Sequence, residues 1–279
     1  MNTVKTVLLL GLLSGLLLFL GEVFGGRNGL YIGLALAVAM NFFSYFFSDK
    51  LALATYGAQP VTPEQNSAVY ARVAPIVGGL AQRMGIPMPK LWLIMENSPN
   101  AFATGRNPQH ASVAFTAGIL NAMSDDEIEG VVAHELGHVL HRDILISSVA
   151  ATIASAITFL ARMGFFFGGT RDDEEEGGAW GGFLMIILAP IAAILIQMAI
   201  SRSREYDADA ASAKYTSSPY KLISALQKLD AYSRRLPMDA TPSTAHLFII
   251  QPFTGESLMR LFSTHPSTAD RIRRLQAMM

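Results

Sequence analysis

Four apolar stretches dominate the hydrophobic pattern of the chain. They run from Val7 to Gly25, from Gly29 to Phe47, from Ile144 to Ala161 and from Ala179 to Ile200. Each is close to the about 20 residues that a helix needs to cross the hydrocarbon core of a bilayer. The first contains a single charged residue, Glu22, and the second and third contain none. The pattern therefore predicts four transmembrane helices.

Two alternatives apply to these stretches. The first could be a cleaved signal peptide, because Lys5 precedes an apolar run. Against that interpretation, no A-x-A-like cleavage site follows, and the second apolar stretch begins almost at once. The third and fourth stretches could instead be buried core helices, since Ser147, Pro190 and Gln197 make them less apolar than the first pair.

Four spans would return the chain to its starting side, so two water-facing parts, 48–143 and 201–279, would share one compartment. The other parts are a pair of spans in 1–47 and a second pair in 144–200, joined by an acidic loop. Five Lys or Arg residues flank the span ends on the N-terminal side and three flank the other ends. Since the positive excess lies in the cytoplasm, we expect an inner-membrane protein whose water-facing parts are cytoplasmic.

Polar and apolar spacing also predicts elements in the water-facing parts. Thr62-Pro63-Glu64-Gln65 is typical of a helix start, and Gly85 ends that helix. Two strand-like runs, Lys90 to Met95 and Ser112 to Thr116, flank a turn-rich stretch. The expected fold is therefore mostly α, with a small β-sheet in the water-facing domain.

Further helices are expected around the second half of the chain. Ser124 and Glu127 form a capping-box pattern, and the helix that follows meets no proline before Gly164. It is therefore predicted to continue straight through 131–141 into the third apolar stretch. Helices are also expected from about Pro219 to Arg235 and after Ser267.

Composition narrows the possible chemistry. Charged residues make up 15% of the chain, whereas soluble domains carry about 25%. Because the chain has no cysteine, a metal could be bound only by histidine and carboxylate. The net charge of −1 gives no basic excess for nucleic acid, and no phosphate-binding GxxxxGK[ST] loop indicates a nucleotide.

The candidate site is the sequence His134-Glu135-Leu136-Gly137-His138 on a predicted helix. Residues four apart share a helix face, about 5–6 Å apart at Cβ, so both imidazoles can bind one Zn²⁺. Glu135 follows the first ligand and can accept a proton from metal-activated water. An ordinary helix face with two histidines is the alternative interpretation.

A catalytic zinc needs a third protein ligand. His141 lies two turns beyond His134, about 10 Å along the axis, which is too far for one straight helix to bring all three histidines to one ion. Glu205, just after the fourth stretch, is the better candidate, and Asp209 one turn later could accept the outer N–H of a liganding histidine. The alternative is a charged helix end with surface ion pairs.

Three motifs together, HELGH, SRSREYDAD and STHPSTADRIRRL, resemble the HtpX-type membrane metallopeptidases, which are relatives of the CAAX prenyl proteases. The resemblance implies a gluzincin-type domain in which zinc is bound by His134, His138 and Glu205, with Glu135 as the base. It also implies that Asn100-Ala101-Phe102 lies in an edge strand that holds substrate backbone. His265 is implied as a hydrogen-bond donor to the tetrahedral intermediate.

The expected function is zinc-dependent hydrolysis of misfolded or damaged membrane proteins, the quality-control role that the resemblance implies. The expected partners are polypeptide substrates and the lipid bilayer. One rival is a specific processing peptidase of the prenyl-protease kind, for which four spans are too few to enclose a chamber. A second rival is a metal sensor or transporter, which leaves Glu135 without a role.

Overall fold

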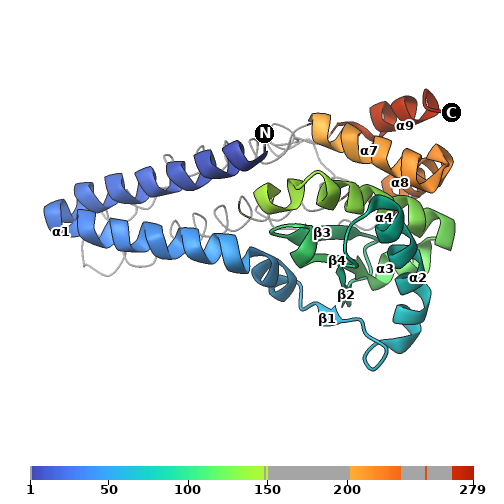
Figure 1. The fold of residues 1–279 in the computed structure, drawn as a ribbon, viewed down its shortest axis with the longest axis horizontal. Helices are drawn as coiled ribbons and strands as arrows, with labels where there is room; N and C mark the ends of the chain where they lie inside the picture. The colour runs from blue at the N-terminus through green and yellow to red at the C-terminus, as the bar shows by residue number, and fades with distance from the viewer. Residues whose placement is uncertain (1, 148, 150–201, 234–248, 250–265) are drawn as a thin grey trace, which may run out of the picture.

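The chain is mostly helical and contains a small mixed β-sheet (Figure 1). The computed structural model describes residues 2–147, 149, 202–233, 249 and 266–279. Most of the third apolar stretch and all of the fourth lie outside these residues, and so does His265. The expectation of four spans and the division of the chain into four parts therefore remain predictions.

The first two apolar stretches form a helical hairpin within α1 (Asn2–Thr55). The helix is interrupted at Gly26, whose φ of 55° and ψ of −140° are not helical. The two arms approach so closely that a Cβ on Gly21, Gly29 or Gly33 would overlap backbone atoms of the opposite arm. Glycine at these positions therefore allows the tight packing of the hairpin.

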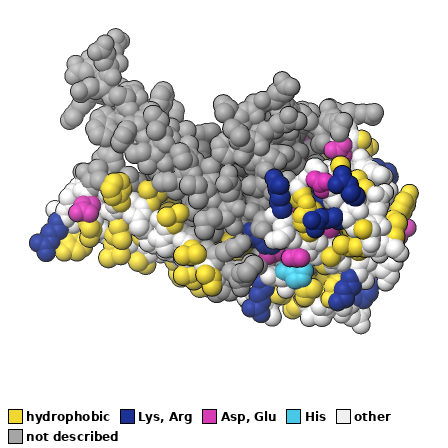
Figure 2. All heavy atoms as spheres, turned by 90° about the horizontal axis from the view of Figure 1, so that it is seen from above, with side chains coloured by type: hydrophobic (Ala, Val, Ile, Leu, Met, Phe, Trp, Pro, Cys, Tyr) yellow, Lys and Arg dark blue, Asp and Glu magenta, His cyan; other side chains and the backbone are white. Residues whose placement is uncertain are grey.

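The second arm of the hairpin has the length and composition of a membrane span. Gly25–Phe47 is apolar over 23 residues, and only 17% of its most apolar window is buried. The first arm contains a shorter apolar helix, Thr6–Phe19. Figure 2 shows hydrophobic side chains along the hairpin at the left, whereas charged side chains gather mainly over the right-hand part. Among the described residues, one segment is thus long and apolar enough to cross a membrane.

The sheet has the strand order β1-β2-β4-β3. Its strands are β1 (Gln59–Pro60), β2 (Lys90–Ile94), β3 (Ala101–Gly105) and β4 (Ala111–Thr116). β2 and β4 are parallel, whereas β1 pairs with β2 and β3 pairs with β4 in the antiparallel direction. Both strands predicted from the pattern are therefore confirmed, and β3 lies inside the turn-rich stretch, where the family resemblance implied an edge strand at 100–102.

Each face of the sheet packs on different helices. On one face, Leu91, Val113 and Ala103 belong to the main core, with helices α2 (Ser67–Met84) and α4 (Asp125–Leu140). On the other face, Phe102 and Ala114 pack against the last turns of α1, which continues eight residues beyond Phe47. The part of α1 that follows the candidate span is thus packed against the edge strand β3.

The helix start that we expected at Thr62 is wrong. α2 is Ser67–Met84, with the left-handed residue Asn66 as its N-cap, while Gly85 ends it as predicted. Residues 62–65 instead form a local turn, in which the Gln65 N–H donates to Thr62 Oγ1 at 3.1 Å and the Thr62 N–H to the Gln65 carbonyl at 2.8 Å. Thr62 and Gln65 therefore satisfy each other's hydrogen-bonding groups within the turn, and the helix begins only at Ser67.

The site helix, α4 (Asp125–Leu140), starts as predicted but does not run straight on. Both hydrogen bonds of the capping box between Ser124 and Glu127 are present. The helix ends at its C-cap His141, because Arg142 adopts a left-handed φ of 59°. Helical structure resumes at 143–147. The predicted continuous helix into the third stretch is therefore wrong, and the break redirects Asp143.

Three C-terminal helices pack on α4. They are α7 (Arg202–Thr216), α8 (Pro219–Ser233) and α9 (Thr268–Gln276). Gly130 lies against the backbone at Leu222 of α8, and Gly137 against Ala208 of α7. Two glycines on α4 thus allow close contact with both helices, and this contact brings the Glu205 side chain of α7 to the histidines. The predicted helices after Pro219 and Ser267 are confirmed.

Candidate metal centre and active site

The two histidines of α4 lie side by side at the interface with α7. The ring centroids of His134 and His138 are 4.9 Å apart, and the rings are nearly perpendicular. The His134 side chain is 1% exposed and that of His138 is 17% exposed. Helical spacing explains why the two rings share one face of α4. The partial exposure of His138 leaves the pair accessible from its side.

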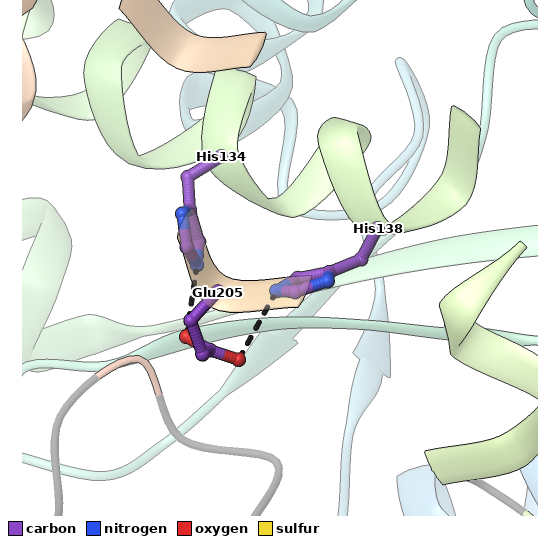
Figure 3. A group of neighbouring side chains, drawn as sticks. All are labelled: His134, His138 and Glu205. Atoms are coloured by element: carbon purple, nitrogen blue, oxygen red, sulfur yellow. Dashed lines mark ion pairs between the residues drawn. The ribbon is translucent and has the colours of Figure 1, made fainter. Parts of the chain in front are cut away.

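Glu205 of α7 completes a cluster of three potential metal ligands (Figure 3). Its carboxylate lies between the two rings, with Oε2 3.6 Å from Nε2 of His134 and Oε1 3.6 Å from Nε2 of His138. All three ligand atoms lie within 4.8 Å of one another. Ligands at about 2.0–2.1 Å from a tetrahedral zinc are about 3.3 Å apart, and two imidazoles with one carboxylate are a zinc donor set. The residues fit a zinc ion.

A carboxylate contacts the outer nitrogen of each histidine. Asp209 Oδ1 is 2.9 Å from Nδ1 of His134, the contact that sequence spacing led us to expect. Asp143 Oδ2 is 3.2 Å from Nδ1 of His138, a contact that we did not predict. Such partners fix the ring orientation and the tautomer of metal-binding histidines. The left-handed Arg142 is what turns Asp143 back toward the site.

Arg271 of α9 is a second residue that sequence reasoning missed. Its side chain is 2% exposed, and its guanidinium donates to both carboxylate oxygens of Asp209, at 2.7 and 3.0 Å. A third hydrogen bond, at 2.7 Å, goes to the carbonyl of Ile249. α9 is a short helix with three arginines, and sequence reasoning did not distinguish Arg271 from the other two. Packing of Leu275, one turn later, places Arg271 inward.

The electrostatics of the metal ligands follow from this burial. Burial and the nearby Arg271 charge lower the pKa of His134 to about 4, which keeps the ring neutral as metal binding requires. Burial alone would lower the pKa of His138, but Asp143 and Glu205 raise it to about 9. In the metal-free site His138 therefore holds a proton, which a metal must displace.

Glu135 lies beside the ligand cluster, where the charges of His138 and Glu205 act on it, and its carboxylate contacts the sheet. Its side chain is buried, and Oε2 accepts a 2.8 Å hydrogen bond from the Ala103 N–H of β3. Burial, together with the Glu205 charge, raises the pKa of Glu135 to about 7. A carboxylate with that pKa can both accept and return a proton near neutral pH.

The segment expected to hold substrate backbone adjoins this carboxylate. β3 is the edge strand of the described sheet, and Ala101 and Phe102 are its first residues. Asn100 is buried just before it, with its N–H donating to Thr116 Oγ1 at 2.8 Å. Phe102 faces α1, so Ala103 rather than the predicted residues contacts Glu135. Substrate binding by 100–102 remains a prediction.

The remaining histidines have separate positions. His141, which we rejected as a ligand, is the exposed C-cap of α4 and is not part of the three-residue cluster. His265 lies outside the described residues, so its suggested hydrogen bond to the reacting group remains a prediction. The three-residue cluster, with a buried glutamate on the same helix, is the arrangement that zinc-type metallopeptidases use.

Comparison with known proteins gives the family. Residues 67–279 match the model of peptidase family M48. A Protease HtpX homolog from Desulfatibacillum aliphaticivorans is 52% identical, over 98% of this chain and 89% of the relative. Another, from Persephonella marina, is 51% identical over 100% of this chain and 98% of the relative. The chain belongs to peptidase family M48, which confirms the resemblance suggested by the three motifs.

A solved structure shares the fold. The crystal structure of S. mikatae Ste24p aligns with 98% of this chain and 65% of its own, with a TM-score of 0.50 and 21% sequence identity. At that identity the likeness concerns the fold alone. It extends the match to nearly the whole chain, including the region before residue 67 that the family model does not cover.

Proposed function

We propose that the chain is a zinc-dependent endopeptidase of the inner membrane that hydrolyses misfolded or damaged membrane proteins from the cytoplasmic side. Membership of family M48 supports peptide hydrolysis, and the name shared by its relatives agrees with a quality-control role. The observation that carries the proposal is the convergence of three ligands with Glu135, which is hydrogen-bonded to the edge strand.

The proposed ligands are His134, His138 and Glu205, with one ion per chain. When bound there, zinc supplies Lewis acidity, which polarises a peptide carbonyl and lowers the pKa of water. Glu135 takes the proton of the attacking water and passes it to the leaving amide nitrogen. Asp209 and Asp143 hold the histidine rings in the orientation in which Nε2 faces Glu205.

Substrate backbone is proposed to add to β3 as a further strand, which is a common mode of peptide recognition. The hydrogen bond from the Ala103 N–H to Glu135 shows that this residue turns its amide away from β4. The base therefore lies where an added chain would pair. His265 is proposed to donate to the tetrahedral intermediate, as the family resemblance implies.

The position of the candidate site relative to the membrane supports the proposal that its substrates are embedded in the membrane. The candidate span ends at Phe47, and the same helix reaches Phe102 of the edge strand through its last turns. His138 lies only six residues before the third apolar stretch in the sequence. A substrate anchored in the same bilayer would meet such a site at high effective concentration.

The proposal is tested with a pair of membrane substrates that differ in stability. The purified chain in detergent is incubated with a stable membrane protein and with a destabilised variant of it, with zinc and with a zinc chelator. We expect zinc-dependent cleavage of the destabilised variant at least tenfold faster than of the stable parent. Equal cleavage of both proteins would contradict the quality-control role, and cleavage that persists in chelator would contradict the metal site.

A further inference from the structure

A cavity lies outside the active site, where the hairpin meets the sheet. It has a volume of about 350 Å³ and opens to the surface. One wall is α1, with the aromatic side chains of Phe46 and Phe47 and, a turn later, Lys50. The other wall comes from the sheet, with Lys90 at the start of β2 and Arg106 just after β3.

The cavity continues the contact between α1 and the sheet toward the membrane. Lys90 pairs with Ser112 in the register of the sheet, two residues from the row of Phe102 and Ala114, which packs under the last turns of α1. Moving from that row to Ser112 therefore leads toward Phe47, where the candidate span ends. The cavity thus lies at the level where the hairpin leaves the membrane.

The charge of the cavity is positive and is not balanced by ion pairs. Lys50, Lys90 and Arg106 all line it, against the single carboxylate of Asp49. Across the part of the chain that the structure describes, none of the three cations forms a salt bridge. Three cations without acidic partners around one hollow indicate an anionic ligand.

Aromatic rings hold two of these cations in place. The Arg106 guanidinium carbon lies 5.3 Å from the centroid of the Phe46 ring, and Lys50 Nζ lies 5.1 Å from that of Phe47. These rings belong to a cluster of phenylalanines at the end of the candidate span. Aromatic side chains are typical of the headgroup level of a bilayer, and here they are combined with cationic groups in one cavity.

We propose that this cavity binds the phosphate headgroup of an anionic phospholipid from the leaflet on the catalytic side. Lys50, Lys90 and Arg106 contact the phosphate, and Phe46 and Phe47 contact the glycerol end of the acyl chains. The proposal rests on the membrane location of α1 and not on the peptidase chemistry. A lipid there bridges α1 and the end of β3, the strand whose Ala103 contacts Glu135.

A lipid is favoured over a soluble anion by the composition of the walls. A free phosphate would need only the cations, and it would gain nothing from the exposed rings of Phe46 and Phe47. An anionic lipid uses both surfaces, because its phosphate lies at the headgroup level and its chains enter the apolar region beside the span. The two sources differ in whether acyl chains are needed for binding.

The test measures lipid binding to the full chain in neutral detergent, with Glu135→Gln present throughout to prevent self-cleavage. The chain is titrated with short-chain phosphatidylglycerol, with short-chain phosphatidylcholine and with inorganic phosphate. We expect saturable binding of phosphatidylglycerol, at least tenfold weaker binding of phosphatidylcholine, and no competition by millimolar phosphate. Equal affinity for the two lipids, or full competition by phosphate, would overturn the proposal.

Matched double variants separate the cavity from general surface charge. Lys90→Gln with Arg106→Gln removes two cavity cations without changing the residues next to the span, and should weaken phosphatidylglycerol binding about 10- to 30-fold. Lys214→Gln with Arg273→Gln removes the same charges from exposed positions of α7 and α9 and should change binding less than twofold. Equal loss in both would show nonspecific attraction and overturn the proposal.

Each double variant also carries a control for folding. Zinc content and thermal unfolding temperature should match those of the parent, since the four substituted side chains lie outside the metal cluster. If the cavity variant binds phosphatidylglycerol normally while it keeps its zinc, the lipid proposal fails and the peptidase proposal is unaffected. Loss of lipid binding with retained zinc supports the cavity as the site.

Discussion

Arg271 carries a full charge inside the site and joins three elements. Burial would lower its pKa, but the carboxylates of Asp209 and Glu205 raise it, so the guanidinium stays charged. Asp209 in turn contacts the outer nitrogen of His134. The arginine therefore positions a metal ligand through the aspartate, although it was not among the residues indicated by the sequence.

Replacing Arg271 with methionine should weaken the metal site. The change leaves the Asp209 carboxylate buried without the two hydrogen bonds from the guanidinium, and we expect zinc affinity to fall about 10- to 100-fold. Lysine should restore little of it, because it cannot make the paired contact of a guanidinium. Zinc titration of the purified variants checks this, with the exposed Arg273→Met as control. Unchanged affinity in Arg271→Met would show that the contact has no positioning role.

Two variants test whether Glu205 or His141 supplies the third metal ligand. Glu205→Ala removes one of the three converging donors, so zinc occupancy should drop sharply. His141→Ala changes an exposed C-cap and should leave occupancy unchanged. Metal analysis of both variants, purified under identical conditions, provides the comparison. Equal zinc in wild type and Glu205→Ala would mean that another residue supplies the third ligand.

The sequence predicted the parts of the site that lie at helical spacing. His134, His138 and Glu135 share one helix, and Glu205 and Asp209 are one turn apart on another, so spacing alone indicated the groups that the structure brings together. Asp143 and Arg271 depend on tertiary structure. One is turned inward by the left-handed Arg142 and the other by the packing of α9, and neither has a local signal.

Among the elements, the site helix α4 is tied to α8 at its N-terminal end by Glu127. Glu127 is the capping-box partner of Ser124, and it also accepts hydrogen bonds from Ser224 at 2.6 Å and Lys228 at 2.7 Å. Burial alone would raise the pKa of Glu127, but these hydrogen bonds lower it to about 2. The charged carboxylate therefore stabilises the folded state above its ordinary pKa of 4.5.

Glu127→Gln should destabilise the fold in a pH-dependent way. Glutamine can keep the capping bond but loses the ion pair, at a cost of about 1–3 kcal/mol near pH 7. Because the folded-state pKa is depressed, the difference from wild type should be complete above about pH 5 and shrink as the pH falls from 4.5 toward 2. Thermal unfolding across this range measures it. Glu64→Gln, an exposed carboxylate in the turn before α2, is the control, and a difference independent of pH would contradict the account.

Element boundaries were harder to predict than element types. The helices, both strands and the capping box followed from periodicity and from end signals that the structure confirms. The turn at Thr62 resembled a helix start because its side chain makes the same kind of hydrogen bond in both settings. β3 lies among turn residues, so its hydrophobic pattern did not predict it, and the edge strand at 100–102 was implied by the family resemblance alone. The strand is held by β4 and by Glu135.

For the whole molecule, the main prediction concerns the four spans. Because the chain has no cysteine, single cysteines can be placed at Arg27 in the hairpin turn, at Glu64 before α2, at Lys214 in α7 and at Glu175 in the acidic loop. An impermeant thiol reagent added from the periplasmic side should label positions 27 and 175 and leave 64 and 214 unlabelled until the membrane is opened. Labelling of 175 only from the side of 64 would exclude four spans.

The central claim is that Glu135 acts as the base of a zinc peptidase and not as a metal ligand. Its carboxylate accepts a hydrogen bond from Ala103, and it is not among the three grouped ligand residues, which are His134, His138 and Glu205. The most direct measurement is the zinc content and the casein-cleavage rate of Glu135→Gln beside wild type in the same detergent. We predict equal zinc with proteolysis reduced by about 10²–10⁴-fold. Full activity in this variant, or loss of its zinc, would contradict the account.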